Sequence, residues 1–223
     1  MEYIARIRSD FPTKFGIPRQ SGLTGDLRSE IIFEPAYRNP DFLRGIDRWS
    51  HLWLLWRFDR IEDGKFSPTV APPKLGGKTR VGVFATRSPF RPNPIGLSCV
   101  KLVDVKLHTK DGPVLYVAGA DLADQTPIYD IKPYLPYADC HPDATDAFEE
   151  SRNASPLEVV FPDELLQKIP PDKRAGLMQA LCQNPRPGYQ HDPNRRYGFN
   201  FSGFDVRFQI DGGTLTVVEI VTL

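Results

Sequence analysis

The sequence lacks several features that mark specialised classes of protein. Its 223 residues include only three cysteines, Cys99, Cys140 and Cys182, which are odd in number and widely spaced. Such spacing fits neither a disulfide framework nor a zinc site, so we expect buried or incidental thiols. No cluster of histidine, cysteine and aspartate has the spacing of metal ligands, and we expect no metal cofactor.

Net charge and long apolar runs are also missing. The 28 lysines and arginines balance 28 aspartates and glutamates, so no overall field draws the chain onto nucleic acid or an anionic membrane. Any nucleic-acid surface must therefore be local. The longest apolar stretch, residues 52–56, is far shorter than a membrane span, and the N-terminus lacks the cationic-then-apolar pattern of a signal peptide. We predict a cytoplasmic protein that does not enter a membrane.

Helical periodicity is nearly absent before residue 150, where alternating, branched and aromatic residues predict strands instead. These strands lie at residues 3–8, 51–58, 78–85, 98–105 and 114–120. Because an open sheet this small would leave exposed edges, we predict a mainly β fold with a closed or nearly closed β-barrel. No glycine-rich turn joins a strand to a helix, which argues against a doubly wound nucleotide-binding fold.

A different pattern follows residues 139–150, a segment with five acids and no base. Residues 157–161 predict a strand, and Pro162 opens a short helix that ends before Pro170. The sequence further predicts a helix over 171–182, strands over 205–210 and 214–221, and a hairpin turn at 211–213. We therefore predict a barrel domain over residues 1–150 and a smaller α+β C-terminal domain over 151–223.

Proline is abundant, with 22 residues, and is concentrated in two segments that we interpret as stiff loops, residues 81–97 and 126–136. The first presents Arg87, Arg91 and Asn93 between residues with restricted backbones, which lowers the entropy lost when a polar ligand binds. It belongs to a stretch, residues 64–103, with seven basic residues and no acid. That stretch indicates a polyanion partner, or a solvated face balanced by acids elsewhere.

The two proline-rich segments, with two further motifs, resemble the TrmO family, also called YaeB or TsaA-like. The motifs are Gly82–Leu97, Asp130–Tyr134, Pro18-Arg19-Gln20 and Asn184–Tyr189, and the resemblance spans nearly the whole chain. It implies an S-adenosylmethionine-dependent tRNA methyltransferase that modifies N6 of threonylcarbamoyl-adenosine, the base just 3′ of the anticodon. It also implies a β-barrel, a smaller C-terminal domain that binds tRNA, and a homodimer.

The resemblance carries a cofactor site over to named positions. These are Pro18, Arg19, Gln20, Asp59, Arg60, Arg87, Leu97, Asp124, Gln125, Thr126 and Pro127. The chain departs from many relatives at Asp59, where they carry histidine, and at Gln125, where they carry glycine. Because glutamine resists a left-handed backbone, we expect an altered loop shape at Gln125.

The chemistry of methyl transfer needs neither a metal nor an oxyanion hole, because the positive charge of the donor is dissipated and alignment supplies much of the rate. The target nitrogen is part of a urea-like linkage, so a base that removes its proton would make it more nucleophilic. We name Asp130 as that base and Asp124 as the second candidate. The alternative is that Asp130 accepts backbone N–H groups and fixes the turn at residues 131–133.

The basic and aromatic residues leave further alternatives. The guanidinium group of Arg87 can donate two parallel hydrogen bonds to a carboxylate or a hydroxyl pair of the cofactor, or it can pair with a carboxylate inside the barrel. We expect Arg91 to face outward, and we assign phosphate contacts with the anticodon loop to Lys14, Arg91, Lys132, Arg186, Arg195 and Arg196.

Among the aromatic residues we expect Trp49, Trp53 and Trp56 to pack in the barrel core or a dimer interface, and His51 to be a core histidine. Tyr134, Tyr189 and Tyr197 are better placed to stack on bases. The other functions considered are a non-catalytic RNA-binding barrel and a phosphate-ester hydrolase. The hydrolase would need a metal or an activated nucleophile, and the sequence indicates neither.

Overall fold

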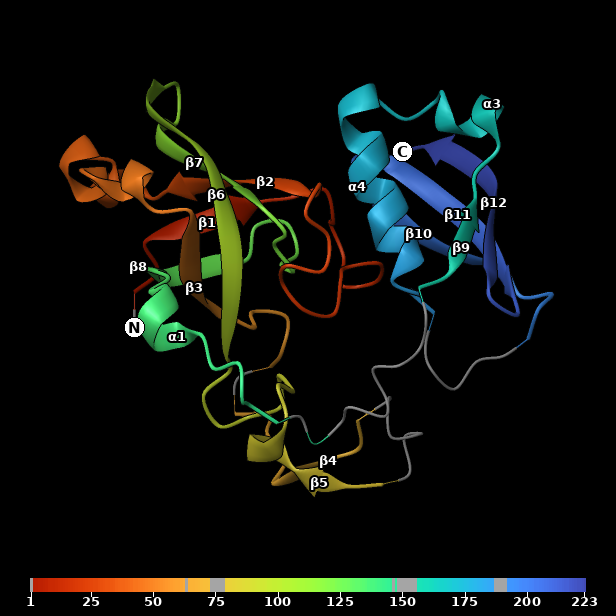
Figure 1. Ribbon diagram of the computed structural model, residues 1–223, viewed down its shortest axis with the longest axis horizontal. Coiled ribbons are helices and arrows are strands. Elements are labelled where there is room, and N and C mark those ends of the chain that lie inside the picture. Colours follow the sequence, from red (N-terminus) through yellow and green to blue (C-terminus); the bar gives the residue numbers. More distant parts are fainter. Residues whose placement is uncertain (1, 63, 73–78, 146, 148–155, 187–191) are drawn as a thin grey trace.

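The computed structural model describes residues 2–62, 64–72, 79–145, 147, 156–186 and 192–223. Six strands form a closed barrel in the order β1-β2-β7-β6-β3-β8, which occupies the left half of Figure 1. They are β1 (Ala5–Arg8), β2 (Arg28–Phe33), β3 (His51–Arg57), β6 (Ile95–Thr109), β7 (Gly112–Ala118) and β8 (Pro127–Pro133). The prediction of a mainly β fold with a closed barrel is confirmed.

The barrel core follows from period-two alternation along the strands. On β3, Leu52, Leu54 and Trp56 point inward and are at most 8% exposed, while Trp53 and Leu55 lie on the outer face. Inward residues of the remaining barrel strands fill the rest of the interior. Each fully buried aliphatic side chain stabilises the barrel by about 1.5–3 kcal/mol.

The aromatic residues around β3 divide between the barrel core and the outer face, and packing of the outer ones in a dimer interface stays a prediction. Trp56 belongs to the barrel core, but Trp49 is 38% exposed and Trp53 is outside the barrel. Trp53 donates a hydrogen bond from Nε1 to Asp139 at 2.8 Å and packs on Tyr134 at 5.7 Å between ring centroids. His51 is not a core residue either, because the β3 alternation turns it outward, where its ring lies 6.2 Å from that of Tyr134.

A second body combines a four-stranded sheet with helices, and its strand order is β10-β11-β12-β9. The strands are β9 (Glu158–Val160), β10 (Tyr197–Phe201), β11 (Phe204–Asp211) and β12 (Thr214–Thr222), and the helices are α3 (Asp163–Leu166) and α4 (Pro171–Cys182). The predicted helices and the β11–β12 hairpin are present, and Gly212 adopts a φ of 54° in the turn. The sequence did not predict β10.

Two predictions around the proline-rich segments are wrong. Residues 78–85 do not form one strand: β5 (Val81–Gly82) pairs with β4 (Thr69–Val70), and η5 (Val83–Ala85) is a 3₁₀ turn. Lys78 lies outside the described residues. Residues 127–133 are not a loop but β8, which closes the barrel against β1 and β3. Pro127 and Pro133 stand at the ends of β8, where proline is tolerated because it can lack a ladder hydrogen bond.

Short helical turns complete the chain, and the first long loop joins the two bodies. The turns are η1 (Pro35–Tyr37), η2 (Pro40–Leu43), η3 (Ile46–Arg48) and α1 (Pro136–Asp139). The loop between β1 and β2 contributes Phe11 and Leu27 to the core of the second body, and Asp10 forms an ion pair with Lys173 at 2.8 Å. In Figure 1 this loop extends toward α4.

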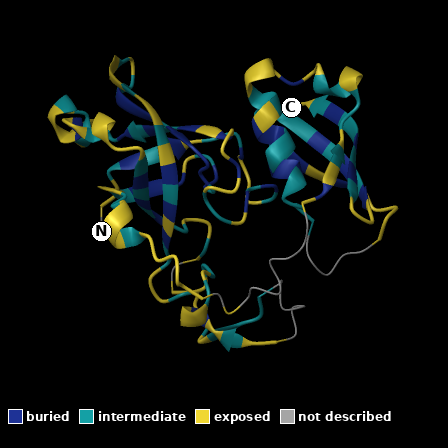
Figure 2. Cartoon of the chain, in the orientation of Figure 1, coloured by how far each residue is buried: buried dark blue, intermediate teal, exposed yellow. Residues whose placement is uncertain are grey.

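Buried residues gather in two places, inside the barrel and between α4 and the four-stranded sheet (Figure 2). The proposed domain ranges remain a prediction, because the loop between β1 and β2 contributes to the second core. No helix in the described part of the chain is long and apolar enough to cross a membrane.

Candidate functional site

One end of the barrel is built where β7 separates from β6. At this end the last pair of the β6–β7 ladder is Lys101 with Ala118. Two residues earlier on β6, the N–H of Cys99 donates to the Ser21 hydroxyl at 3.0 Å. The N–H of Gly22 donates to the Gly119 carbonyl at 2.9 Å. The loop before β2 therefore takes the place that β7 leaves, and it brings residues 18–20 next to β6.

Glycine is required at this junction. Gly119 has a φ of 78°, and a Cβ there would lie 3.3 Å from the backbone of Gly22. A side chain at this position would meet both a strained backbone and a close neighbour.

Arg87 connects residues 81–97, which we call the proline-arginine loop, to the loop before β2. Its Nη1 donates to Gln20 Oε1 at 2.5 Å, and Gln20 Nε2 donates to the Arg19 carbonyl. Arg87 is exposed, and this contact uses one of its five N–H donors. The contact brings together three residues that the resemblance assigns to the cofactor.

A second contact joins Arg60 to the segment 124–127. Arg60 donates from Nη1 to the Pro12 carbonyl at 2.8 Å and from Nη2 to the Asp124 carbonyl at 3.2 Å. The Asp124 carboxylate accepts the Ser9 N–H at 3.0 Å and also contacts the Gln125 amide. This second candidate base is therefore engaged in holding its own loop.

Gln125 keeps the turn that we expected it to disturb. Its φ is 66°, in the left-handed region, so the expectation of an altered loop shape is wrong. The backbone explains this, because the Gln125 N–H donates to the Ile7 carbonyl at 2.8 Å and its carbonyl accepts Arg6 Nη1 at 3.0 Å. These two bonds offset the cost of about 1–2 kcal/mol of a left-handed residue that is not glycine.

The remaining cofactor positions differ in exposure. Pro18, Thr126 and Pro127 are buried and shape the loops, whereas Asp59 is exposed and Leu97 is 48% exposed. Leu97 lies on the outer face of β6. An exposed leucine beside polar loops offers an apolar surface to a ligand ring.

Asp130 lies on the same outer barrel face as Leu97. In the ladder Leu97 pairs with Leu55, and Leu55 pairs with Asp130, so two strand spacings separate Leu97 from Asp130, or about 10 Å. Asp130 Oδ1 accepts the Ile131 N–H at 2.9 Å, and Oδ2 pairs with Lys132 Nζ at 2.8 Å. The backbone contact of the alternative interpretation is present, and the carboxylate is still 45% exposed.

The basic residues assigned to tRNA occupy different surroundings. Arg91 does not face outward: its Nη2 donates to the Thr86 carbonyl at 3.1 Å and braces the loop. Lys14, Arg195 and Arg196 are exposed. Arg186 is half-buried and lines a cavity of about 190 Å³ beside the β11–β12 hairpin.

Two of the three tyrosines named for base stacking are engaged within the protein. Tyr134 packs on Trp53 and His51, as described above. Tyr197 is 7% exposed and stacks on Phe208 at 5.7 Å, so the prediction that its face is open to a base is wrong. Tyr189 lies outside the described residues.

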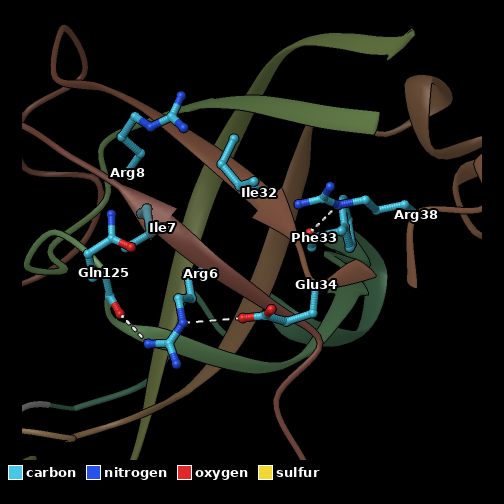
Figure 3. Close-up of a pocket in the computed structure, with 8 residues that line it drawn as sticks. All are labelled: Arg6, Ile7, Arg8, Ile32, Phe33, Glu34, Arg38 and Gln125. Atoms are coloured by element: carbon cyan, nitrogen blue, oxygen red, sulfur yellow. Dashed lines mark hydrogen bonds and ion pairs between the residues drawn. The ribbon is translucent and has the colours of Figure 1, made fainter. Parts of the chain in front are cut away.

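A cavity of about 220 Å³ opens beside β1 and β2 and has three arginines in its lining, Arg6, Arg8 and Arg38 (Figure 3). Sequence reasoning missed it, although the alternation of Arg6 and Arg8 about buried Ile7 was a signal that both lie on the outer face. Arg6 pairs with Glu34 at 3.2 Å, and Arg8 pairs with Glu30 and Asp111. Local carboxylates thus balance much of the charge, and of the expected cofactor residues only Gln125 lines this cavity.

Asp121 is a further residue at the junction that sequence reasoning missed. Its Oδ1 accepts the Ser98 hydroxyl at 2.5 Å, and burial raises the pKa of its carboxyl, against the opposing effects of Ser98, Arg87 and Ser21. Among the described residues, no group of three or more His, Cys, Asp or Glu is arranged to hold a metal ion.

Comparisons with known proteins agree over both bodies of the chain. The model of the tRNA-methyltransferase O N-terminal domain matches residues 6–140, and that of the TrmO C-terminal domain matches residues 154–223. A tRNA (adenine(37)-N6)-methyltransferase of Escherichia coli is 41% identical over 217 residues, which cover 94% of this chain and 92% of the relative. One from Eikenella corrodens is 43% identical over 174 residues, 78% of this chain and 97% of the relative.

A solved structure also agrees with the chain in fold. The crystal structure of TrmO from Pseudomonas aeruginosa matches with a TM-score of 0.78 and 31% identity, and the match covers 99% of this chain and 95% of that one. The motifs, the closed barrel and the relatives agree, and the chain belongs to the tRNA-methyltransferase O family.

Proposed function

We propose that this chain transfers the methyl group of S-adenosylmethionine to N6 of N6-threonylcarbamoyladenosine (t6A) at position 37 of tRNA, which gives m6t6A. Its family consists of tRNA methyltransferases, and its relatives from Escherichia coli and Eikenella corrodens are named for adenine 37. The observation that carries the proposal is the contact between Arg87 and Gln20. It unites two sequence-distant motifs of the expected cofactor site at the end of the barrel where β7 separates from β6.

The residues at this end fit the chemistry of the methyl donor. S-adenosylmethionine has an amino-acid head with a carboxylate, a sulfonium and an adenine ring. The guanidinium fork of Arg87 suits the carboxylate, and exposed Leu97 suits the face of the adenine. The segments 18–20 and 124–127 offer backbone groups, the first held by the bond from Arg87 to Gln20 and the second by Arg60 and the backbone of Gln125. When bound, the donor supplies an electrophilic methyl carbon.

Alignment and proton removal are the tasks of the protein. Stiff loops hold the reactants in line, which is the main source of rate in such a displacement. Asp130 accepts the N6 proton as the new N–C bond forms and the S–C bond to the methyl group breaks, which leaves S-adenosylhomocysteine. Its carboxylate suits this role because it is on the same outer face as Leu97 and is partly open to solvent. Lys132 pairs with Asp130 at 2.8 Å and holds that carboxylate in position in the absence of substrate.

The proposal includes the tRNA and a second copy of the chain. We assign the phosphate contacts to the exposed residues Lys14, Lys132, Arg195 and Arg196 and to the half-buried Arg186. Arg91 contributes by shaping its loop. The C-terminal domain carries Arg186, Arg195 and Arg196, so we assign tRNA recognition to it. We place a homodimer contact at Trp49 and Trp53, which lie outside the barrel core. Because its substrate is tRNA, we place the reaction in the cytoplasm.

The test is a reaction with two tRNA substrates that differ only at position 37. Purified protein, S-adenosylmethionine and tRNA carrying t6A should give m6t6A, measured by mass spectrometry of the digested nucleosides. The same tRNA with plain adenosine at position 37 should remain unmethylated there. Methylation of the plain adenosine alone would assign a different substrate, and no methylation of either tRNA would favour a non-catalytic RNA-binding barrel.

A further inference from the structure

A chain of hydrogen bonds runs from the barrel core to Asp121. Trp56 Nε1 donates to Ser98 Oγ at 2.9 Å, and the Ser98 hydroxyl, which is fully buried, donates to Asp121 Oδ1 at 2.5 Å. Because the indole is only a donor, the serine proton must point at the carboxylate. The core therefore fixes the orientation of Asp121 before any ligand binds.

Asp121 also meets the other segments of the site. The backbone N–H of Ser21 bonds to it, and the charge of Arg87 acts on it. Ser21 in turn accepts the N–H of Cys99 on β6. Asp121 thus lies where the loop before β2, the proline-arginine loop, β6 and the segment after β7 come together.

Among the described residues, no lysine or arginine forms an ion pair with the Asp121 carboxylate. Burying an anion costs free energy unless a positive charge is close to it. Arg87, the cation whose charge acts on Asp121, donates a hydrogen bond from Nη1 to Gln20 Oε1 instead. Neutral donors, the Ser98 hydroxyl and the backbone N–H groups of Asp121 itself and of Ser21, supply the hydrogen bonds that Asp121 receives. A ligand with an N–H cation would complete the site.

We infer that Asp121 binds the α-ammonium group of the methyl donor while Arg87 binds its α-carboxylate. This rests on the proposed function. The ammonium and the carboxylate are attached to the same carbon of the donor, so they need an anion and a cation that are close neighbours. Arg87 bonds to Gln20, the next residue Ser21 bonds to Cys99 on β6, and the neighbouring Ser98 bonds to Asp121. These contacts place Asp121 and Arg87 on adjoining segments at the same end of the barrel. The pair would recognise the zwitterionic head of an amino acid, a group that RNA lacks.

Calorimetry with two ligands tests the assignment. S-adenosylmethionine and S-adenosylhomocysteine share the α-ammonium, but only the first has a sulfonium. Asp121→Asn keeps the hydrogen bond from Ser98, because the amide oxygen also accepts, and it removes the charge. We expect this variant to bind both ligands about tenfold or more weakly, the effect of losing a charge-assisted hydrogen bond. Asp104→Asn, an exposed position on β6, should bind both ligands like the wild type.

A second measurement needs no variant and so does not depend on how Asp121→Asn folds. The wild-type chain should bind an S-adenosylhomocysteine analogue without the α-amino group about tenfold or more weakly than S-adenosylhomocysteine. Equal affinity for that analogue, or for the Asp121→Asn chain, overturns the inference. A loss for S-adenosylmethionine alone would move the contact to the sulfonium and also overturn it. A wild-type chain that binds neither natural ligand contradicts the proposed function itself.

Discussion

The indole ring of Trp56 lies directly against the backbone of Gly96. The two residues pair across β3 and β6, and a Cβ on Gly96 would come within 2.2 Å of Trp56 Cε2. The ring is held on two sides, by the bond from Nε1 to Ser98 and by Phe58 at 4.3 Å between ring centroids. The glycine near the end of the proline-arginine motif therefore serves the packing of the barrel.

Gly96→Ala should destabilise the protein because the indole cannot move away without losing its hydrogen bond. We expect a loss of about 1–3 kcal/mol in the free energy of unfolding, the usual cost of an overpacked core. Urea unfolding followed by tryptophan fluorescence measures it. Gly82→Ala is the matched control, since a Cβ there meets nothing within 4 Å and the φ is −57°. Equal stability of the two variants would contradict this account of Gly96.

The left-handed backbone at Gln125 predicts that two substitutions there differ in stability. Gln125→Gly fits a φ of 66° without strain, whereas Gln125→Val places a branched side chain in a region that such residues avoid. We expect the valine variant to unfold at least about 1 kcal/mol more easily than the glycine variant. Thermal melts of both proteins give the answer, and a valine variant as stable as the glycine variant would show that this backbone is not constrained.

Asp121 should make stability depend on pH. Burial raises the pKa of its carboxyl above the unfolded value of 3.8, so the folded state binds more protons than the unfolded state between the two values. The contribution of Asp121 to stability is therefore fully present below pH 3.8 and is lost as the pH rises through the folded pKa.

Asp121→Asn removes this dependence. We expect the variant to gain stability relative to the wild type as the pH rises from about 4 to 7. The measurement is the difference in unfolding free energy between the two proteins across that range. A difference that stays flat with pH would mean that the carboxyl titrates normally.

Asp130→Asn separates the chemical role from the structural one. The amide oxygen still accepts the Ile131 N–H, so the strand should stay intact while the base is lost. We expect kcat to fall by about 10²–10⁴-fold, with the dissociation constant for S-adenosylmethionine unchanged. Rapid-quench assays under saturating tRNA provide kcat, and Asp104→Asn is again the control. Turnover close to that of the wild type would leave Asp130 with its turn-fixing role alone.

The sequence predicted the parts of this fold that depend on local pattern. The alternation in residues 51–58 and the hairpin glycines near Gly212 are local signals, and both elements formed. β8 was missed because Pro127 and Pro133 are typical of a loop, and its role depends on pairing with Ala5, which is more than a hundred residues away in the sequence. Asp121 was missed for a similar reason, since its contact with Ser98 exists only after the barrel closes.

The position of the bound methyl donor tests the central claim most directly. Crystals soaked with S-adenosylmethionine should hold it at the barrel end, with its amino-acid head against Arg87 and Asp121 and its adenine against Leu97. Density for the ligand in the arginine-lined cavity beside β1 and β2 would contradict the account. So would the absence of any ordered ligand in crystals whose packing leaves Arg87 and Leu97 accessible to solvent.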